Sequence, residues 1–278
     1  MSAETVAEPL TSALARLETR WGSAAVRVGS GGPQVNGALA LAPESVDEPL
    51  PTTGPGPADT VSTGFASLDA LLGPGGLPRA VSASLRGARS SGKTTLALHC
   101  IAQAQAQGAI AAIIDIGRTF DPLEAASRGI DLRWLLIVRP EDAEEGLAIA
   151  GALLSGRAVD LLLVDLPERL PARHEASLRR VAAHARRTGA RLLVLEPAGL
   201  GGQLRGALAE VVGLRLELEH RDWLRLGRDV VGRRIGVNVA KNRFGPPGRA
   251  TEIEIRYLDD GERAPAIERS APIAHRAA

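Results

Sequence analysis

One loop constrains this chain more than any other segment. Residues 87–94 read Gly-Ala-Arg-Ser-Ser-Gly-Lys-Thr and match every position of the pattern G-x-x-x-x-G-K-[ST]. An apolar run of strand length precedes the loop, and a helical pattern follows it. In that setting the glycines let backbone N–H groups curl around a phosphate at a helix N-terminus. The competing interpretation is a glycine turn with a solvated lysine, which the flanking strand and helix disfavour.

The residue types in and near this loop predict bound ATP and Mg²⁺. Lys93 reaches the β- and γ-phosphates, and the Thr94 hydroxyl coordinates Mg²⁺. Asp165 ends an aliphatic strand pattern and supplies a second group at the metal. We therefore expect Lys93 and Asp165 to act in catalysis. The expected nucleotide-binding residues are Gly87, Ala88, Arg89, Ser90, Ser91, Gly92, Lys93, Thr94 and Thr95.

The pattern around the loop predicts an α/β fold. Apolar runs alternate with helical stretches, which favours a mostly parallel sheet with helices on both faces. The expected strands are 80–85, 109–115, 135–138, 159–165 and 191–196, and the expected helices are 92–107, 122–127, 141–154 and 174–188.

The chain changes character after these elements. Residues 212–220, 235–243 and 251–257 alternate between apolar and polar side chains, and Gly245-Pro246-Pro247-Gly248 joins the last two stretches. An antiparallel extension at one sheet edge is expected.

The N-terminal region predicts a separate arm. Leu10, Leu14, Leu17 and Trp21 share one helix face, and a short strand pattern follows at 24–28. We expect an arm over 1–28, a flexible Gly/Pro-rich linker over 29–60, an ATPase core over 61–262 and a mobile tail over 263–278. The helix either folds back on its own core or contacts a neighbouring subunit or partner, because its apolar face would otherwise be exposed.

Composition narrows the compartment and the partners. One cysteine, Cys100, excludes an internal disulfide, no apolar run approaches the ~18 residues of a membrane span, and the polar, acidic start is unlike a signal peptide. A cytoplasmic, nucleoid-associated protein is expected.

Of 33 basic residues only Lys93 and Lys241 are lysines, and the formal net charge is +1. DNA binding then depends on local basic patches, because seven aromatic residues cannot build stacking platforms.

One basic stripe follows the helix before Gly189. It is either a single-stranded DNA contact or a solvated face whose arginine stems pack on the core. The segment 198–205 is either a second DNA-contacting loop or a plain connection. The candidate DNA residues are Arg173, Arg179, Arg180, Arg186, Arg187 and Arg205.

At this point several segments together resemble a known family. STGFASLDALLGPGGLP, GARSSGKTT, IIDIGRTFDP, AVDLLLVD and VNVAKNRF occur in the order of the ATPase core of RecA recombinases, over about 61–257. The resemblance implies a RecA-like fold with ATP held between subunits. It also implies that Lys241 and Arg243 reach the nucleotide of a neighbouring subunit, and that the N-terminal arm packs on that neighbour.

The positions that differ from RecA are as informative as those that match it. Gly117 occupies the position of the glutamate that activates water, Glu124 that of an adenine-stacking tyrosine, and Pro197 that of a γ-phosphate-sensing glutamine. Both DNA-binding loops look shortened, to 166–172 and 198–205, and we expect no counterpart of RecA's C-terminal helical domain. Glu196 or Asp121 either replaces the missing base or is a strand-end or helix-cap carboxylate.

This pattern resembles the ImuA group of RecA-like proteins. It implies a weakly ATP-hydrolysing, DNA-associated accessory protein of the DNA damage response, supporting translesion synthesis and induced mutagenesis. The implied partners are DNA, an ImuB-like polymerase-family protein, an error-prone replicative-type polymerase or RecA. Two alternatives remain open: a strand-exchange recombinase, and a non-hydrolysing adaptor that binds or caps RecA or polymerase partners.

Overall fold

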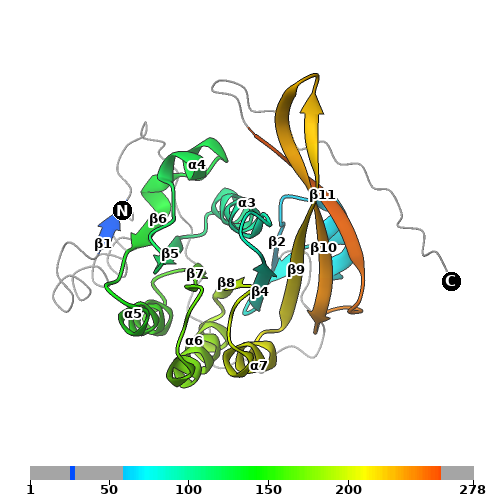
Figure 1. Cartoon of the computed structure of the whole chain (residues 1–278). Coiled ribbons are helices and arrows are strands. Elements are labelled where there is room, and N and C mark those ends of the chain that lie inside the picture. Colours follow the sequence, from blue (N-terminus) through cyan, green and yellow to red (C-terminus); the bar gives the residue numbers. More distant parts are fainter. Residues whose placement is uncertain (1–25, 29–58, 258–278) are drawn as a thin grey trace.

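A computed structural model describes residues 26–28 and 59–257 of the chain. In this part, a nine-stranded sheet is covered by helices on both faces (Figure 1). A separate pair is formed by β2 (Thr60–Val61) and β3 (Leu77–Pro78). The order across the large sheet is β1 (Val26–Val28), β6 (Leu135–Val138), β5 (Ala111–Asp115), β7 (Leu161–Asp165), β8 (Arg191–Pro197), β4 (Ser82–Gly87), β9 (Leu214–Leu226), β10 (Asp229–Asn242) and β11 (Ala250–Arg256).

The centre of the sheet is parallel and its edges are antiparallel. Each neighbouring pair from β6 to β9 runs parallel, whereas β1 at one edge and β10 and β11 at the other are antiparallel. In β7, Leu161 and Leu163 pack in one apolar cluster and Leu162 and Val164 in the other. A strand buried on both faces is apolar throughout, which is why this run has no polar alternation.

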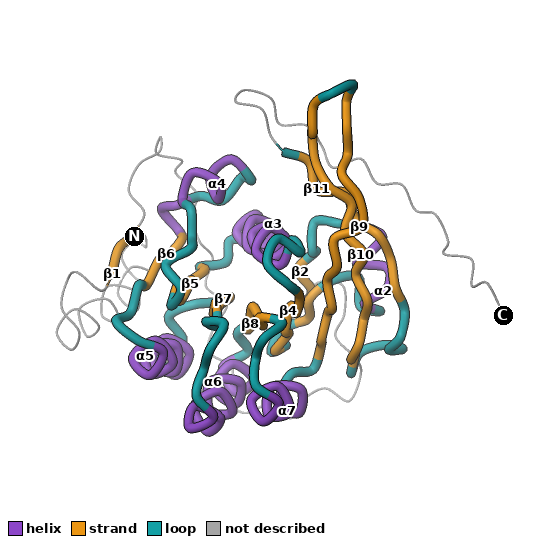
Figure 2. The backbone as a smooth tube through the Cα atoms, viewed as in Figure 1, coloured by secondary structure: helices purple, strands orange, loops and turns teal. Residues whose placement is uncertain are grey.

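Helices divide between the two faces of the sheet (Figure 2). The first face is covered by α2 (Ala66–Leu72) and α3 (Lys93–Ala106), with α4 (Pro122–Ser127) beside them; the second carries α5 (Ala143–Ser155), α6 (Glu175–Thr188) and α7 (Gly202–Val211). Two short 3₁₀ turns, Leu132–Trp134 and Ala172–His174, precede β6 and α6. Asp142 caps α5 by accepting a hydrogen bond from Glu145 N at 2.9 Å. These elements confirm the expected α/β architecture.

Two regions differ from the sequence-based expectation. β9 and β10 are longer than expected and form a hairpin that turns at Gly227–Arg228, with register shifts along the pair. The outer part of the hairpin is largely exposed, so burial imposes no apolar pattern there. The segment expected as a loop over 198–205 instead enters α7 at Gly202. Leu204 and Leu208 of α7 are buried beside α6, and this packing outweighs the low helix propensity of a glycine-rich run.

The termini are only partly described. The expected helix over 10–21, most of the linker and the tail lie outside the described residues. Val26–Val28 pairs with β6 of the same chain, so this piece of the arm covers an edge of its own sheet. Among the described helices, none has the length and apolarity that a bilayer crossing requires.

Candidate nucleotide-binding site

The carboxyl ends of the central strands meet at one edge of the sheet. Gly87 lies beside Pro197 across the β4–β8 pair, and Asp115 lies beside Asp165 across the β5–β7 pair. The glycine-rich loop leaves β4 at this edge and leads into α3. In open α/β sheets ligands bind outside the carboxyl ends of the strands, so the fold brings the expected phosphate and metal groups to such a position.

The loop conformation depends on Gly92. Its φ is +90°, and a Cβ there would lie 2.0 Å from Ile235 Cδ1 of β10. Ser90 also has a positive φ of 58°, and Ser91 N donates to Ala88 O at 3.2 Å. The result is a tight turn directly before the first helical residue, Lys93, as a phosphate-binding loop requires. The backbone therefore fits a nucleotide phosphate.

Lys93 lies against this loop. Its Nζ donates to Gly87 O at 2.9 Å and to Ala88 O at 3.0 Å. Burial lowers the pKa of Lys93, while the negative charges of Asp165 and Glu168 oppose the change. These two hydrogen bonds and the partial burial of Lys93 favour the phosphate-loop interpretation over that of a solvated lysine. A compact ammonium held among carbonyl oxygens can also bind phosphate oxygens at the same place.

Asp165 belongs to a small polar cluster beside the loop. Thr119 Oγ1 donates to Asp165 Oδ2 at 3.0 Å. Burial raises the pKa of Asp165, nearby Asp115 acts in the same direction, and the Thr119 hydrogen bond and Lys93 oppose them. The buried Asp115 accepts hydrogen bonds from Thr119 N at 2.8 Å and Phe120 N at 3.2 Å, and Arg139 Nε lies 3.2 Å from it. A cation of Mg²⁺ type suits oxygen ligands such as this carboxylate and the hydroxyl of Thr94, which follows Lys93 in the first turn of α3.

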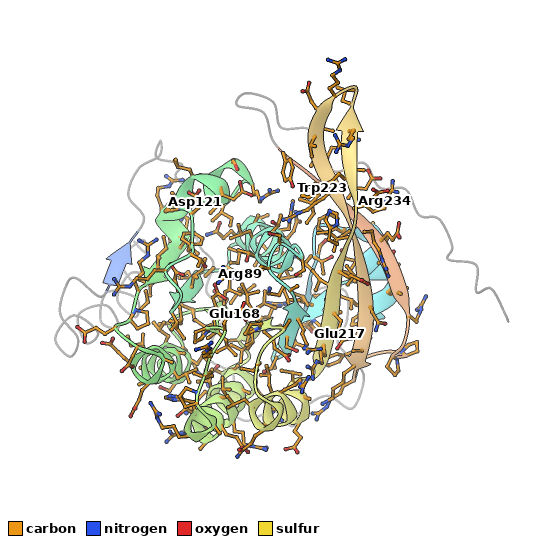
Figure 3. All side chains as sticks on the ribbon, viewed as in Figure 1. Arg89, Asp121, Glu168, Glu217, Trp223 and Arg234 are labelled. Atoms are coloured by element: carbon orange, nitrogen blue, oxygen red, sulfur yellow. The ribbon has the colours of Figure 1, made fainter. Side chains whose placement is uncertain are left out.

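Glu168 is a site residue that sequence reasoning missed. It lies on the loop after β7, and Arg89 Nε of the phosphate loop is 3.6 Å from its Oε1; the two side chains lie close together in Figure 3. A Cβ on Gly199 would lie 3.3 Å from Glu168 Oε2. The side chain of Glu168 therefore lies close to the loops that follow β4 and β8. The only sequence signal was its spacing, three residues after Asp165.

Gly117 has room for a side chain. Its φ is not positive, and a Cβ there would meet only the Thr119 side chain, at 3.5 Å. Packing among the described residues therefore does not require a glycine.

Nearby, Asp121 caps α4 through Leu123 N at 2.9 Å, and Glu124 accepts from Arg128 Nε at 2.6 Å. Both carboxylates already have structural partners.

Glu196 does not lie where a water-activating base is needed. Its carboxylate is fully buried, with Arg215 Nη2 at 2.7 Å and Arg86 Nε at 3.2 Å. Alternation along β8 puts its side chain on the face of Val194, which packs among α5, α6 and α7 rather than beside α3. Burial raises the pKa of Glu196, and Arg215 and Arg86 oppose the change. Of the two alternatives for Glu196, this burial and these ion pairs favour the strand-end structural carboxylate over the base.

The other predicted cations lie away from the loop. Lys241 Nζ donates to Ala209 O at 2.5 Å, and Arg243 Nη2 donates to Glu210 O at 3.1 Å, so both engage carbonyls at the C-terminal end of α7. They do not contact their own phosphate loop. Arg179 joins α6 to α7 through Glu175 at 3.0 Å and Glu210 at 2.7 Å. Arg173, Arg180, Arg186, Arg187 and Arg205 are exposed, although Arg180 also contacts Ser177 and Arg187 also contacts His184.

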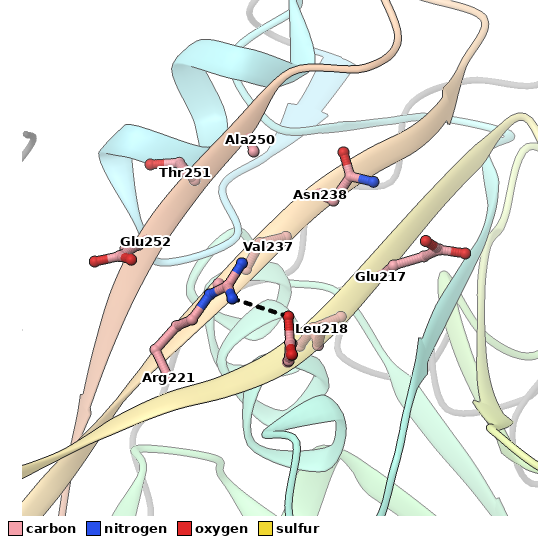
Figure 4. A pocket seen from close by; sticks show the side chains of 10 residues that line it. Glu217, Leu218, Arg221, Val237, Asn238, Ala250, Thr251 and Glu252 are labelled. Carbon is pink, nitrogen blue, oxygen red and sulfur yellow. Dashed lines mark ion pairs between the residues drawn. The ribbon is translucent and has the colours of Figure 1, made fainter. Parts of the chain in front are cut away.

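A separate hollow lies on the meander of β9, β10 and β11. Its volume is about 400 Å³, and its lining includes Glu217, Glu219 and Glu252 (Figure 4). Arg221 reaches across Gly236 and pairs with Glu219 at 3.0 Å. Each of these glutamates has an arginine partner, so the hollow offers no excess of positive charge to a phosphate.

Comparisons with known proteins agree with this geometry. The family described as RecA N-terminal domain matches residues 52–194. The chain is 35% identical to Protein RecA of Latilactobacillus sakei and 34% identical to Protein RecA of Chlorobium limicola, over 71% of its own length in both cases. These matches cover 64% and 65% of the two relatives. The chain thus spans less than two thirds of their length.

Proposed function

The chain belongs to the RecA family, and on that premise we propose that it binds ATP and Mg²⁺, hydrolyses ATP slowly and associates with DNA. The proposal depends on which groups of an ATPase site are kept and which are missing. The loop, Lys93, Thr94 and Asp165 keep the groups that hold phosphate and metal, whereas Gly117 offers no carboxylate to activate water.

The residues present assign the steps of such a reaction. Backbone N–H groups of residues 88–93 would hold the phosphates, Lys93 would neutralise the β- and γ-phosphates, and Thr94 and Asp165 would hold the metal. Bound Mg²⁺ would supply Lewis-acid stabilisation of the charge that develops on the phosphates. Positioning of this kind supplies much of the catalysis in phosphoryl transfer, so turnover is slowed rather than abolished when the base is lost.

Among carboxylates near the loop, Glu168 is the best remaining proton acceptor. Asp121 and Glu196 have structural partners, whereas Glu168 is exposed, pairs only loosely with Arg89 and acts on Lys93. An exposed carboxylate with one long ion pair is a poor substitute for a fixed base, because general-base catalysis requires hydrogen-bond contact with the attacking water. This is a second reason to expect slow turnover.

We further propose that neighbouring subunits meet at the nucleotide. Lys241 and Arg243 lie at the end of β10, away from their own loop, which suits cations that serve another subunit. Of the expected arm over 1–28, Val26–Val28 pairs with its own sheet, so the part before it would supply the subunit or partner contact. Among RecA-like proteins the ImuA group fits best, with an ImuB-like protein, an error-prone replicative-type polymerase or RecA as partner, in translesion synthesis and induced mutagenesis.

Two other functions remain as candidates. A strand-exchange recombinase needs DNA-binding loops, and the segment 198–205 here turns into α7 after four residues. An adaptor that binds or caps RecA needs no nucleotide, and the retained loop and Asp165 argue against it. A strand-exchange assay separates the first, and unchanged partner binding by Lys93→Ala would favour the second.

DNA association is tested on the exposed arginines of α6. Arg180 and Arg187 lie two turns apart on one face, so Arg180→Glu/Arg187→Glu should weaken binding to single-stranded DNA. We expect the slope of log affinity against log salt to fall by about 1.4, because each phosphate contact to a single strand contributes about 0.7. Fluorescence anisotropy with a labelled oligonucleotide measures this slope.

A charge-matched control lies on the β9–β10 hairpin. Arg225→Glu/Arg228→Glu changes the net charge equally at two exposed positions away from α6. If both double variants lose affinity alike, only overall charge matters, and α6 is not the DNA-binding face.

A further inference from the structure

A cation of β10 contacts the phosphate-binding loop of its own chain. Arg233 Nη1 donates to Ser90 O at 2.7 Å, and its Nη2 donates to Thr95 Oγ1 at 3.4 Å. Ile235, two residues along the same strand face, packs against Gly92. This face of β10 therefore forms a wall of the loop, although Arg233 is 138 residues from Thr95 in the sequence.

Arg233 has donor capacity to spare. A guanidinium carries five N–H donors, and the two contacts above use two of them. Among the described residues, Arg233 Nε, which is shielded from solvent, makes no hydrogen bond. Each Nη atom still has one unused N–H beside the loop, and these donors suit an acceptor that arrives with a ligand.

The position within the loop indicates which group of a nucleotide this acceptor is. Lys93 takes the β- and γ-phosphates, and the Thr94 hydroxyl lies with the metal. Glu168 lies 3.6 Å from Arg89 of the loop, and the carboxylates of Glu168 and Asp165 both influence Lys93, which favours this end of the loop for the metal and the γ-phosphate. Thr95 is one residue further into α3, and its buried hydroxyl is the one that Arg233 contacts. The α-phosphate is the remaining anionic group.

We propose that Arg233 binds the α-phosphate of the nucleotide held by its own chain. The inference rests on the proposed ATP site and adds a residue to it. A planar guanidinium can bond the α-phosphate while it keeps its contact with Ser90, which a lysine amine cannot do equally well. This contact would offset the loss of base stacking at Glu124, because it moves binding energy from the adenine to the phosphates.

The test compares two neighbouring arginines that face opposite ways. Arg233→Gln removes the contact with the loop, whereas Arg234→Gln removes a guanidinium that pairs with Glu254 at 3.0 Å on the other face of β10. The probes are ATP, ADP and the two diastereomers of ATPαS, each with Mg²⁺, in equilibrium titrations of the full chain. Thermal melts without nucleotide check that each variant folds.

We expect Arg233→Gln to weaken ATP and ADP binding by a similar factor of about 10, the loss of one charge-assisted hydrogen bond, because both ligands carry the α-phosphate. Arg234→Gln should bind both nucleotides as the wild type does. The wild type should prefer one ATPαS diastereomer, and Arg233→Gln should lose that preference. Arg233→Lys, which keeps the charge and perturbs folding less, should give an intermediate affinity and a reduced preference.

Three results would overturn the inference. The first is that Arg233→Gln binds ATP and ADP as tightly as the wild type does. The second is that Arg233→Gln still prefers one ATPαS diastereomer, and the third is that the wild type prefers neither. A preference that survives in Arg233→Gln would mean that Arg233 only stabilises the conformation of the loop. A wild type that binds neither ATP nor ADP would overturn the proposed ATP site itself, and the inference with it.

Discussion

Gly117→Glu should raise the rate of ATP hydrolysis by about 100-fold, the lower end of what a positioned general base contributes. The substitution fits because the φ of Gly117 is not positive and a Cβ there meets only Thr119, at 3.5 Å. Thr119 of the same loop already contacts Asp165, so a carboxylate at 117 starts beside the expected metal site. Steady-state phosphate release at saturating ATP and Mg²⁺ measures the effect.

The matched control is Gly117→Gln, which has the same size but accepts no proton at neutral pH. It should stay close to the wild-type rate, and KM should change little in either variant, because a base acts in the transition state rather than in substrate binding. If Glu and Gln at 117 give the same rate, the missing carboxylate is not what limits turnover.

Lys93→Ala should weaken ATP binding by at least about 100-fold. Contacts of a charged donor with phosphate are worth about 1.5–3 kcal/mol each, and Lys93 is expected to contact both the β- and the γ-phosphate. Two such losses exceed the 2.7 kcal/mol that corresponds to a factor of about 100. Titration with a fluorescent ATP analogue measures the affinity, and thermal melts without nucleotide show whether the variant folds.

Lys93→Arg is the sharper companion variant. An arginine fork does not replace a compact ammonium in a tight loop, so this variant should bind ATP poorly although its charge is unchanged. Arg228→Ala, at the exposed hairpin turn, removes a cation elsewhere and should bind ATP as the wild type does. Normal ATP affinity in Lys93→Ala would contradict the assignment of the loop.

Local patterns were enough to predict the central part of the fold. The parallel strands and the loop have short-range signals, namely apolar runs, a glycine motif and a carboxylate at a strand end. The face of Glu196 was also readable, because it follows Leu195 and so lies on the side of Val194. Treating it as a catalytic candidate ignored that alternation and the burial to which it leads.

Other site features depend on contacts between distant parts of the chain. Arg233 meets Thr95, and Lys241 meets the carbonyls that end α7, only after β10 has joined the sheet. The resemblance to RecA drew attention to Lys241 and Arg243 but not to Arg233. Glu168 carries a spacing signal too weak to separate it from any acidic loop residue. Long-range packing decides all of these, and the local sequence does not encode it.

The fate of bound ATP tests the central claim most directly. The wild-type chain is mixed with ATP and Mg²⁺, freed of unbound nucleotide, quenched after a series of times and analysed for ATP and ADP. Without DNA, we expect the wild-type complex still to hold mostly ATP at times when the Gly117→Glu complex holds mostly ADP. A wild type that retains no nucleotide, or that converts ATP as fast as Gly117→Glu, would contradict it.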